Sequence, residues 1–349
     1  MDNRFFGLTR KELKTLAHRY AESKHIPHPF SEAGAGDEWV MKFLSRHKEL
    51  TLRTPEPTSI ARAKGFNKVE VNKFYNLLME SFPAGASHIW NMDETGIRTS
   101  STKPPKIISQ LGKKQVGSIS NSERGQLITA ICCCNAAGNF LPPVLISPRK
   151  RLPATLLDGA PPDTKAMCSD SGWTNNQLFR DWMQHFVSYA RPNSETRTLL
   201  ILDNHESHKD FDALQFAREN GVTVLSLPPH TSHKLQPLDV TVFGPLSTYY
   251  ERAIFAWQKQ HPHRMMQHYD VAKVFEQAYT HACTPANAIA GFRKSGIYPL
   301  NPLIFPDSEF LSTIQTSAED VTCRPSRTPA TTDQPVSYTH LTLPTILLV

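Results

Sequence analysis

Three aspartates each follow a short apolar segment, in a position where a carboxylate is available for chemistry. Asp93 ends the segment HIWNMD, Asp203 ends TLLILD, and Asp239 follows VTVLSL and a proline-rich loop. Three carboxylates brought together repel one another unless cations neutralise them, and hard oxygen ligands suit Mg²⁺ or Mn²⁺. Two such ions about 4 Å apart activate an attacking water or 3′-hydroxyl and stabilise the leaving oxygen of a phosphodiester. The acids therefore predict metal-dependent phosphodiester chemistry with two ions.

Each acid also has a purely structural interpretation. Asp239 suits a helix N-cap, Asp203 an Asx turn with Asn204, and Asp93 a turn before Gly96. A competing zinc site would use four nearby histidines, but they lack the usual zinc-ligand spacing. These histidines are His205, His208, His230 and His233. We expect them to support the acids or to face DNA.

The elements around these acids alternate in type along the chain. Strands are expected near residues 88–93, 106–112, 126–135 and 140–147, as an antiparallel meander. A helix at 174–189, a strand at 197–203, a helix at 210–220, a strand at 222–228 and a long helical tail follow. This order predicts one mixed sheet flanked by helices, an α/β fold. A short crossover would bring together the ends of the strands at 197–203 and 222–228, and the proline-rich loop would return Asp239 over Asp203. Within the first strand, alternation points Asp93 and Glu94 to opposite faces.

The N-terminal part reads as a small all-α module. Residues 9–24 form a predicted helix with a Thr9/Glu12 capping box, Asp37 is expected to cap a second helix, and residues 71–82 form a third. Residues 53–68 are expected to be an extended basic connector. Most of the net charge of +6 lies within residues 1–82, and such clustering favours phosphate binding. The expected DNA contacts are Lys42, Arg46, His47, Lys48, Arg53, Arg62 and Lys64; a solvated helix face is the alternative.

Other features narrow the class of protein. The six cysteines contain no CxxC pair, which favours a reducing compartment, and those of ICCCN are expected to be core residues. No signal peptide or membrane-spanning segment is expected. Residues 304–335 read as a disordered tail rich in Ser, Thr and Pro. The end of the chain, 336–349, is expected to be non-native, translated from a sequencing adapter.

At the level of motifs the chain resembles a known family. NMDETGI, LLILDNHESH, LPPHTSHKLQPLDVTVFGPL and AGFRKSGIYPLNP are together similar to the DDE-superfamily endonuclease domain of pogo, Tigger and Jerky-like transposases, within the mariner superfamily. FFGLTRKELKTLAHRYAESKHIPHPF and WVMKFLSRHKELTLRTPEPTSIARAKGFNK resemble the second half of a centromere-protein-B-type helix-turn-helix. The resemblance covers about residues 5–303. The family's first DNA-binding subdomain would precede residue 1.

The resemblance implies both an architecture and an activity. It implies a partial helix-turn-helix domain at 1–82 and an RNase H-like endonuclease domain at 83–303. Asp93, Asp203 and Asp239 match the metal-binding acids, whereas Glu94 matches a family position that is not catalytic. Supporting or DNA-facing roles fall to Glu94, Asn204, His205, His208 and His233.

The implied reaction is cleavage at transposon ends followed by attack of the freed 3′-hydroxyl on target DNA. Expected partners are transposon terminal repeats and target DNA, with a homodimer to bring two ends together, no membrane, and action in the nucleus. The rival hypothesis is a domesticated nuclear DNA-binding protein that keeps the fold without transposition.

Overall fold

The structure is a computed structural model, and it describes residues 8–55, 59–83, 85–101, 108–113, 126–151, 154–192 and 197–310. The described residues form two compact units. One contains residues 8–68 and 305–310, and the other contains residues 69–304. The tail segment 311–335 and residues 336–349 lie outside the described part of the chain.

The first unit contains α1 (Arg10–Ser23), α2 (Asp37–Arg46), α3 (Ile60–Gly65) and the short 3₁₀ helix η5 (Asp307–Phe310). The predicted capping box of α1 is present. Asp37 does not cap α2, because Gly36 is the N-cap and the Asp37 carboxylate instead lies 2.8 Å from Lys14 Nζ of α1. Helix α3 lies within the connector that was expected to be extended. At Gly34, with φ of +111°, a Cβ would lie 2.9 Å from the Lys14 carbonyl, so the loop before α2 passes closely over α1.

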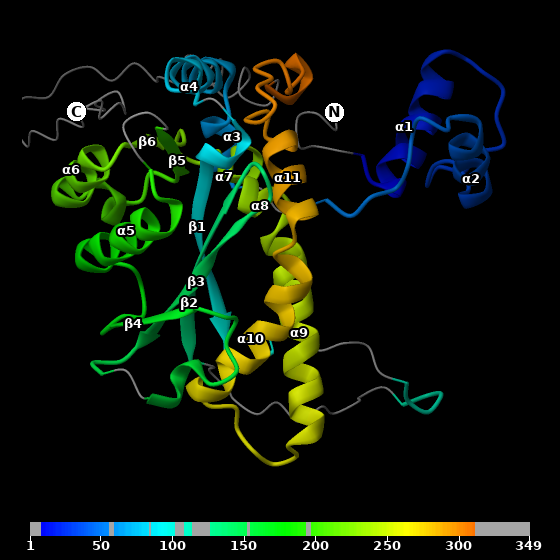
Figure 1. Ribbon diagram of the computed structural model, residues 1–349. Coiled ribbons are helices and arrows are strands. Elements are labelled where there is room, and N and C mark those ends of the chain that lie inside the picture. Colours follow the sequence, from blue (N-terminus) through cyan, green and yellow to red (C-terminus); the bar gives the residue numbers. More distant parts are fainter. Residues whose placement is uncertain are drawn as a thin grey trace, which may run out of the picture. The chain divides into compact units, whose positions relative to one another are not determined.

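The second unit is built on a six-stranded sheet (Figure 1). Its strands are β1 (Ile89–Arg98), β2 (Leu127–Asn135), β3 (Phe140–Pro148), β4 (Lys165–Ser169), β5 (Thr198–Leu202) and β6 (Val222–Ser226). Their order is β4-β3-β2-β1-β5-β6. Strands β1, β2 and β3 pair antiparallel, whereas β3/β4, β1/β5 and β5/β6 pair parallel. The mixed sheet is therefore confirmed, but residues 108–112, expected to form a strand, are turn and irregular structure.

Helices cover both faces of this sheet. On one side lie α5 (Asn176–Ala190) and α6 (Phe211–Glu219); on the other lie α8 (Pro237–Thr241), α9 (Phe243–Gln260), α10 (His268–Ala282) and α11 (Pro285–Lys294) (Figure 1). Four short helices join these elements: η2 (Ala86–His88), η3 (Ala154–Leu157), η4 (Glu206–Lys209) and α7 (Ser232–Leu235).

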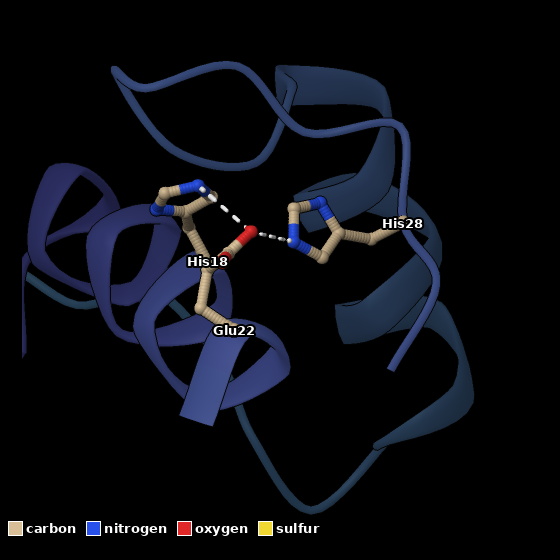
Figure 2. A group of neighbouring side chains, drawn as sticks. All are labelled: His18, Glu22 and His28. Atoms are coloured by element: carbon tan, nitrogen blue, oxygen red, sulfur yellow. Dashed lines mark hydrogen bonds and ion pairs between the residues drawn. The ribbon is translucent and has the colours of Figure 1, made fainter. Parts of the chain in front are cut away.

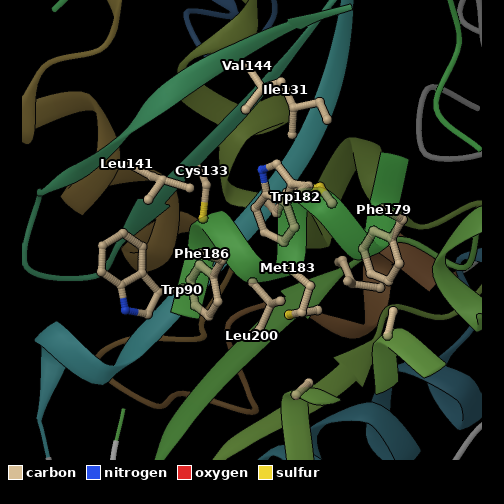
Figure 3. Close-up of a cluster of buried hydrophobic side chains, with 14 of the residues drawn as sticks. Trp90, Ile131, Cys133, Leu141, Val144, Phe179, Trp182, Met183, Phe186 and Leu200 are labelled. Atoms are coloured by element: carbon tan, nitrogen blue, oxygen red, sulfur yellow. The ribbon is translucent and has the colours of Figure 1, made fainter. Parts of the chain in front are cut away.

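The main core lies between the sheet and α5 (Figure 3). Trp182 and Phe186 of α5 pack against alternate residues of the strands, including Trp90 and Met92 of β1 and Cys133 of β2. Each fully buried large apolar side chain contributes about 1.5–3 kcal/mol, and a one-residue slip of β1 would turn this set toward the opposite face. The core therefore fixes the register of β1 and the side chains on its other face. The expectation that the ICCCN cysteines are core residues is confirmed, since Cys132, Cys133 and Cys134 are buried.

Helix α4 (Lys68–Glu80) belongs with the sheet, although it was expected to complete the N-terminal module. It buries Phe74 and Leu78, and the Tyr75 hydroxyl donates a hydrogen bond to the Ser295 carbonyl oxygen at 2.6 Å. The division between the units consequently falls at residue 68 instead of residue 82. None of the helices in the described ranges has both the length and the apolar character needed to cross a membrane.

Candidate active site

Asp93 lies on the face of β1 opposite the main core. Trp90 and Met92 point toward α5, so alternation turns Asn91 and Asp93 toward α8. Burial raises the pKa of the Asp93 carboxyl well above its usual range, and the negative charges of Asp239 and Asp203 raise it further. A hydrogen bond of 2.8 Å from the Glu94 N–H opposes this shift. Each of the other two acids is thus near enough to act electrostatically on Asp93.

Asp203 follows β5 directly, and β5 is the parallel neighbour of β1. Ile201 pairs with Asn91, so the register brings Asp203 beside Asp93 at the same edge of the sheet. The His205 N–H donates to Asp203 Oδ1 at 3.0 Å, which is the bond expected of an Asx turn. The local turn and the convergence of the acids therefore coexist.

An imidazole joins Asp203 to Glu94. His208 Nδ1 lies 2.8 Å from Asp203 Oδ1, and its Nε2 lies 3.5 Å from Glu94 Oε1. Burial alone would lower the pKa of His208, but the adjacent carboxylates of Asp203 and Glu94 raise it to about 9. Burial likewise works to raise the pKa of Asp203, and the hydrogen bond and charge of His208 outweigh it and hold that pKa below its usual value. His208 is therefore cationic at neutral pH and faces carboxylates.

The third acid is positioned by two buried amide side chains that were not anticipated from the sequence. Asn91 Nδ2 donates to Gln236 Oε1 at 2.8 Å and to the Ile201 carbonyl at 3.0 Å, while its Oδ1 accepts from Leu238 N–H at 3.1 Å. Gln236 Nε2 donates to the Met92 carbonyl at 3.0 Å. These bonds fasten the segment before Asp239 to β1 and β5. Asp239 itself is exposed within α8, and Gln236, not Asp239, occupies the N-cap position.

A signal for this amide pair was present in the sequence. Asn91 is a polar residue in an apolar strand, two positions before Asp93 and hence on the same face. An amide buried at such a position requires partners, since an unsatisfied buried polar group costs about 1–3 kcal/mol. Its partner Gln236 could not be identified, because the contact joins residues far apart in the chain.

The donor set suits a hard divalent cation. The three acids offer only oxygen atoms, and Asn204 Oδ1, next to Asp203, is a buried oxygen without a hydrogen-bond partner in the described structure. The competing histidine set is not assembled: in the described ranges, no group of three ligands includes His205, His208, His230 or His233. His205 and His230 are exposed, and His233 is half-buried on α7.

The expected DNA-contacting residues lie on or near α2 and α3. Lys42, Arg46, Lys48, Arg53, Arg62 and Lys64 are exposed, and His47 is half-buried. Part of this charge is paired locally, because Lys42 Nζ lies 2.8 Å from Glu38 and His47 Nδ1 lies 2.9 Å from Glu49.

Part of the chain is similar to a family of endonucleases and to longer proteins. Residues 125–292 match the DDE superfamily endonuclease family, a range that includes Asp203 and Asp239 but begins after Asp93. The chain is 31% identical over 216 residues to the "MFS-type transporter clz9" of Cochliobolus lunatus, covering 61% of this chain and 23% of that protein. It is 26% identical over 246 residues to the "Pogo transposable element with KRAB domain" of Mus musculus, covering 69% of this chain and 39% of that protein. The chain thus spans less than half the length of the curated relatives it matches.

Solved structures supply the fold. A pre-cleavage Mos1 transpososome superposes with a TM-score of 0.51 at 14% identity, covering 88% of this chain and 81% of that one. A Mos1 strand transfer complex gives a TM-score of 0.50 at 12% identity, covering 88% and 80%. At such identities the likeness shows the fold alone. Residues 125–292 are thus similar to DDE superfamily endonucleases, and the sheet with its flanking helices has the RNase H-like fold of the Mos1 structures.

Proposed function

We propose that this chain is a metal-dependent DNA endonuclease of the transposase type, which cuts phosphodiesters and joins 3′-hydroxyl ends. The observation that carries the proposal is the convergence of Asp93, Asp203 and Asp239, held from β1, β5 and α8 by the Asn91–Gln236 pair. A buried carboxyl whose pKa is raised by two neighbouring acids is costly for a fold to retain, unless a cation compensates the charge.

In this proposal the three acids hold the metal ions, and neighbouring side chains support the acids. Asp93, Asp203 and Asp239 would hold two Mg²⁺ or Mn²⁺ ions, which when bound activate the attacking oxygen and stabilise the leaving one. Among the described residues, the three acids do not form a group whose ligand atoms all lie within 4.8 Å of one another. His208 would keep the Asp203 carboxylate ionised and oriented, with Glu94 holding the far side of the ring. Asn204 would offer a further oxygen beside Asp203, and His205 and His233 would support the acids or face DNA.

The exposed cations of the N-terminal unit would bind the DNA backbone. Arg46, Lys48, Arg53 and Arg62 offer charge for phosphates, which positions DNA without reading its bases. The partial helix-turn-helix remains a proposal, as do transposon ends and target DNA as partners, a homodimer that pairs two ends, and action in the nucleus. The structural neighbours include a transpososome and a strand transfer complex, which supports the DNA partners.

The rival function is a domesticated DNA-binding protein that keeps the fold. The exposed cations serve both hypotheses, so only chemistry at the acids separates them. An intact set of three mutually repulsive carboxylates favours the enzyme, because DNA binding does not require it.

The test is nicking of supercoiled plasmid by the full chain, with Mg²⁺, with Mn²⁺ or with chelator. Asp203→Asn removes one acid, and Asp212→Asn, at an exposed carboxylate of α6, is the matched control. We expect nicking that requires metal, disappears in Asp203→Asn and persists in Asp212→Asn. Salt-sensitive DNA binding without cutting by any of the proteins would favour the rival function. Cutting that survives Asp203→Asn would contradict the assigned site.

A further inference from the structure

A second group of ligand side chains lies in the N-terminal unit. His18 and Glu22 stand one turn apart on α1, and His28 belongs to the loop that follows this helix. Glu22 Oε1 lies 2.9 Å from His28 Nε2 and 3.9 Å from His18 Nε2, and the three ligand atoms all lie within 4.8 Å of one another. Figure 2 shows both imidazoles directed at the Glu22 carboxylate. None of these residues has a part in the proposed endonuclease chemistry.

The spacing matches a tetrahedral metal centre. Zinc binds imidazole nitrogen and carboxylate oxygen at about 2.0–2.2 Å, so neighbouring ligand atoms of a tetrahedral site lie about 3.4 Å apart. The two observed separations fall on either side of this value, and small side-chain rotations would bring both to it. Two imidazoles with one carboxylate favour Zn²⁺ over Mg²⁺ or Mn²⁺, in contrast to the all-oxygen set at Asp93, Asp203 and Asp239. Glu22 is 64% exposed, which leaves room for water as the fourth ligand.

The rings are already held in place. Only 12% of the His28 side chain and 22% of the His18 side chain are exposed. The His28 ring stacks on Phe30, with centroids 4.8 Å apart, and Phe30 stands edge-on to Trp39 of α2 at 5.5 Å. Since the ligands need little ordering, less of the binding free energy is lost in positioning them.

One hydrogen bond reports on metal loading. The Phe30 N–H donates to His28 Nδ1 at 3.1 Å, so the ring proton is on Nε2 and faces Glu22. A cation at Nε2 displaces that proton; the neutral ring then carries its proton on Nδ1, and the Phe30 N–H loses its acceptor. Loading therefore changes the environment of a specific backbone amide.

The surrounding module has little core of its own. Among the described residues of the first unit, the buried apolar side chains are Ala21, Ala35, Val40, Phe66 and Phe310, and only the first three lie in residues 8–55, which contain α1 and α2. Small domains with so few buried side chains commonly depend on a metal or another cross-link. We propose that His18, Glu22 and His28 bind one Zn²⁺, which fastens the loop after α1 to that helix and stabilises the pairing of α1 with α2.

The test uses the full chain with Co²⁺ as a visible probe, in excess Mg²⁺ to occupy oxygen-only sites. We expect about one equivalent of tetrahedral Co²⁺, identified by its d–d absorption and displaced by Zn²⁺. His28→Gln and Glu22→Gln should weaken binding by more than the ~10–100-fold that loss of an outer partner causes. The matched control is His25→Asn, because His25 is an exposed neighbour with φ of +52°, which Asn tolerates. Asp203→Asn should also leave this absorption unchanged.

Hydrogen exchange supplies the structural readout. Zn²⁺ should slow amide exchange across α1 and residues 24–35 in the wild type but not in Glu22→Gln. This substitution is nearly isosteric at an exposed side chain, so the variant folds even if His28→Gln does not. The proposal is overturned if the wild type shows no tetrahedral Co²⁺, or if Glu22→Gln binds it as the wild type does. Loss of the signal in Asp203→Asn would likewise overturn it, since the metal would then reside at the acids. Because the endonuclease is tested by nicking, the two proposals can fail separately.

Discussion

Replacing Gln236 with leucine tests whether the buried amide pair positions the third acid. The Gln236 side chain makes a bond of 2.8 Å with Asn91 and one of 3.0 Å with the Met92 carbonyl, in a fully buried environment. Leucine fills a similar volume but makes neither bond. Each lost hydrogen bond is worth about 0.5–1.5 kcal/mol, and a buried group left unsatisfied costs about 1–3 kcal/mol. Asn91 keeps its bond to the Ile201 carbonyl, so we expect a total loss of about 2–4 kcal/mol in the free energy of unfolding.

The same substitution should reduce activity beyond its effect on stability. The Gln236 bonds fix the segment that enters α8, and a displacement of about 1 Å of a catalytic group costs roughly 100-fold in rate. Urea denaturation measures the first effect, and the rate of plasmid nicking by fully folded protein measures the second. Thr129→Val is the matched control, because the Thr129 hydroxyl donates to the Gly172 carbonyl at 2.7 Å and is equally buried. It should lose stability and keep the nicking rate.

Two results would refute this reasoning. If Gln236→Leu unfolds with a free energy within about 0.5 kcal/mol of the wild type, the amide pair does not hold the structure together. If it is destabilised but nicks at the rate of Thr129→Val, the pair supports the fold without positioning Asp239.

Three further predictions concern neighbouring elements. His208→Gln removes the ring that orients Asp203 and keeps it ionised, so the Mn²⁺ concentration for half-maximal nicking should rise. Phe179→Leu shortens a buried side chain that packs on His208 but keeps the imidazole, so it should not change this concentration. Gly291→Ala places a Cβ 2.5 Å from the Pro237 carbonyl oxygen, so α11 must move away from α8. We expect the free energy of unfolding, measured by urea denaturation, to fall by about 1–3 kcal/mol and nicking to become slower. Unchanged stability would contradict the close packing. The Arg180 side chain donates hydrogen bonds to Asp210 and lowers the pKa of that carboxyl. The pair therefore stabilises the folded protein fully above the pKa of an unfolded aspartate, about 3.9, and this stabilisation is lost as the pH falls through the lower pKa of Asp210 in the folded state. Asp210→Asn should therefore lower the thermal midpoint at pH 7 and flatten its decline below pH 4, and a parallel decline in both proteins would show that the pair contributes nothing.

The curated relatives are much longer than this chain, and this difference in length decides which assay is informative. The chain covers 23% of the Cochliobolus lunatus protein and 39% of the mouse pogo element. DNA binding and end pairing can depend on segments that the chain does not contain, whereas the acids and their supports lie within it. Nicking and metal dependence are therefore sharper tests than transposition.

The elements that depend on residues close together in the chain could be predicted from the sequence alone. The capping box fixed the start of α1, period-two alternation separated Asp93 from Glu94, and the apolar segment before Asp203 predicted a strand ending on that acid. The motifs also indicated the mixed sheet and its family. These features involve residues a few positions apart, whose steric and hydrogen-bonding preferences act within one helix turn or one strand.

The contacts between residues far apart in the chain could be seen only in the tertiary structure. The bond between Asn91 and Gln236 joins β1 to the residue before α8. The His208 ring contacts Glu94 of β1 on one side and Asp203, which follows β5, on the other. The assignment of α4 to the sheet and the convergence of His28 on His18 and Glu22 were equally hidden. Such contacts depend on strand order, register and helix packing, which arise from burial of the whole core and leave no periodic trace in the sequence.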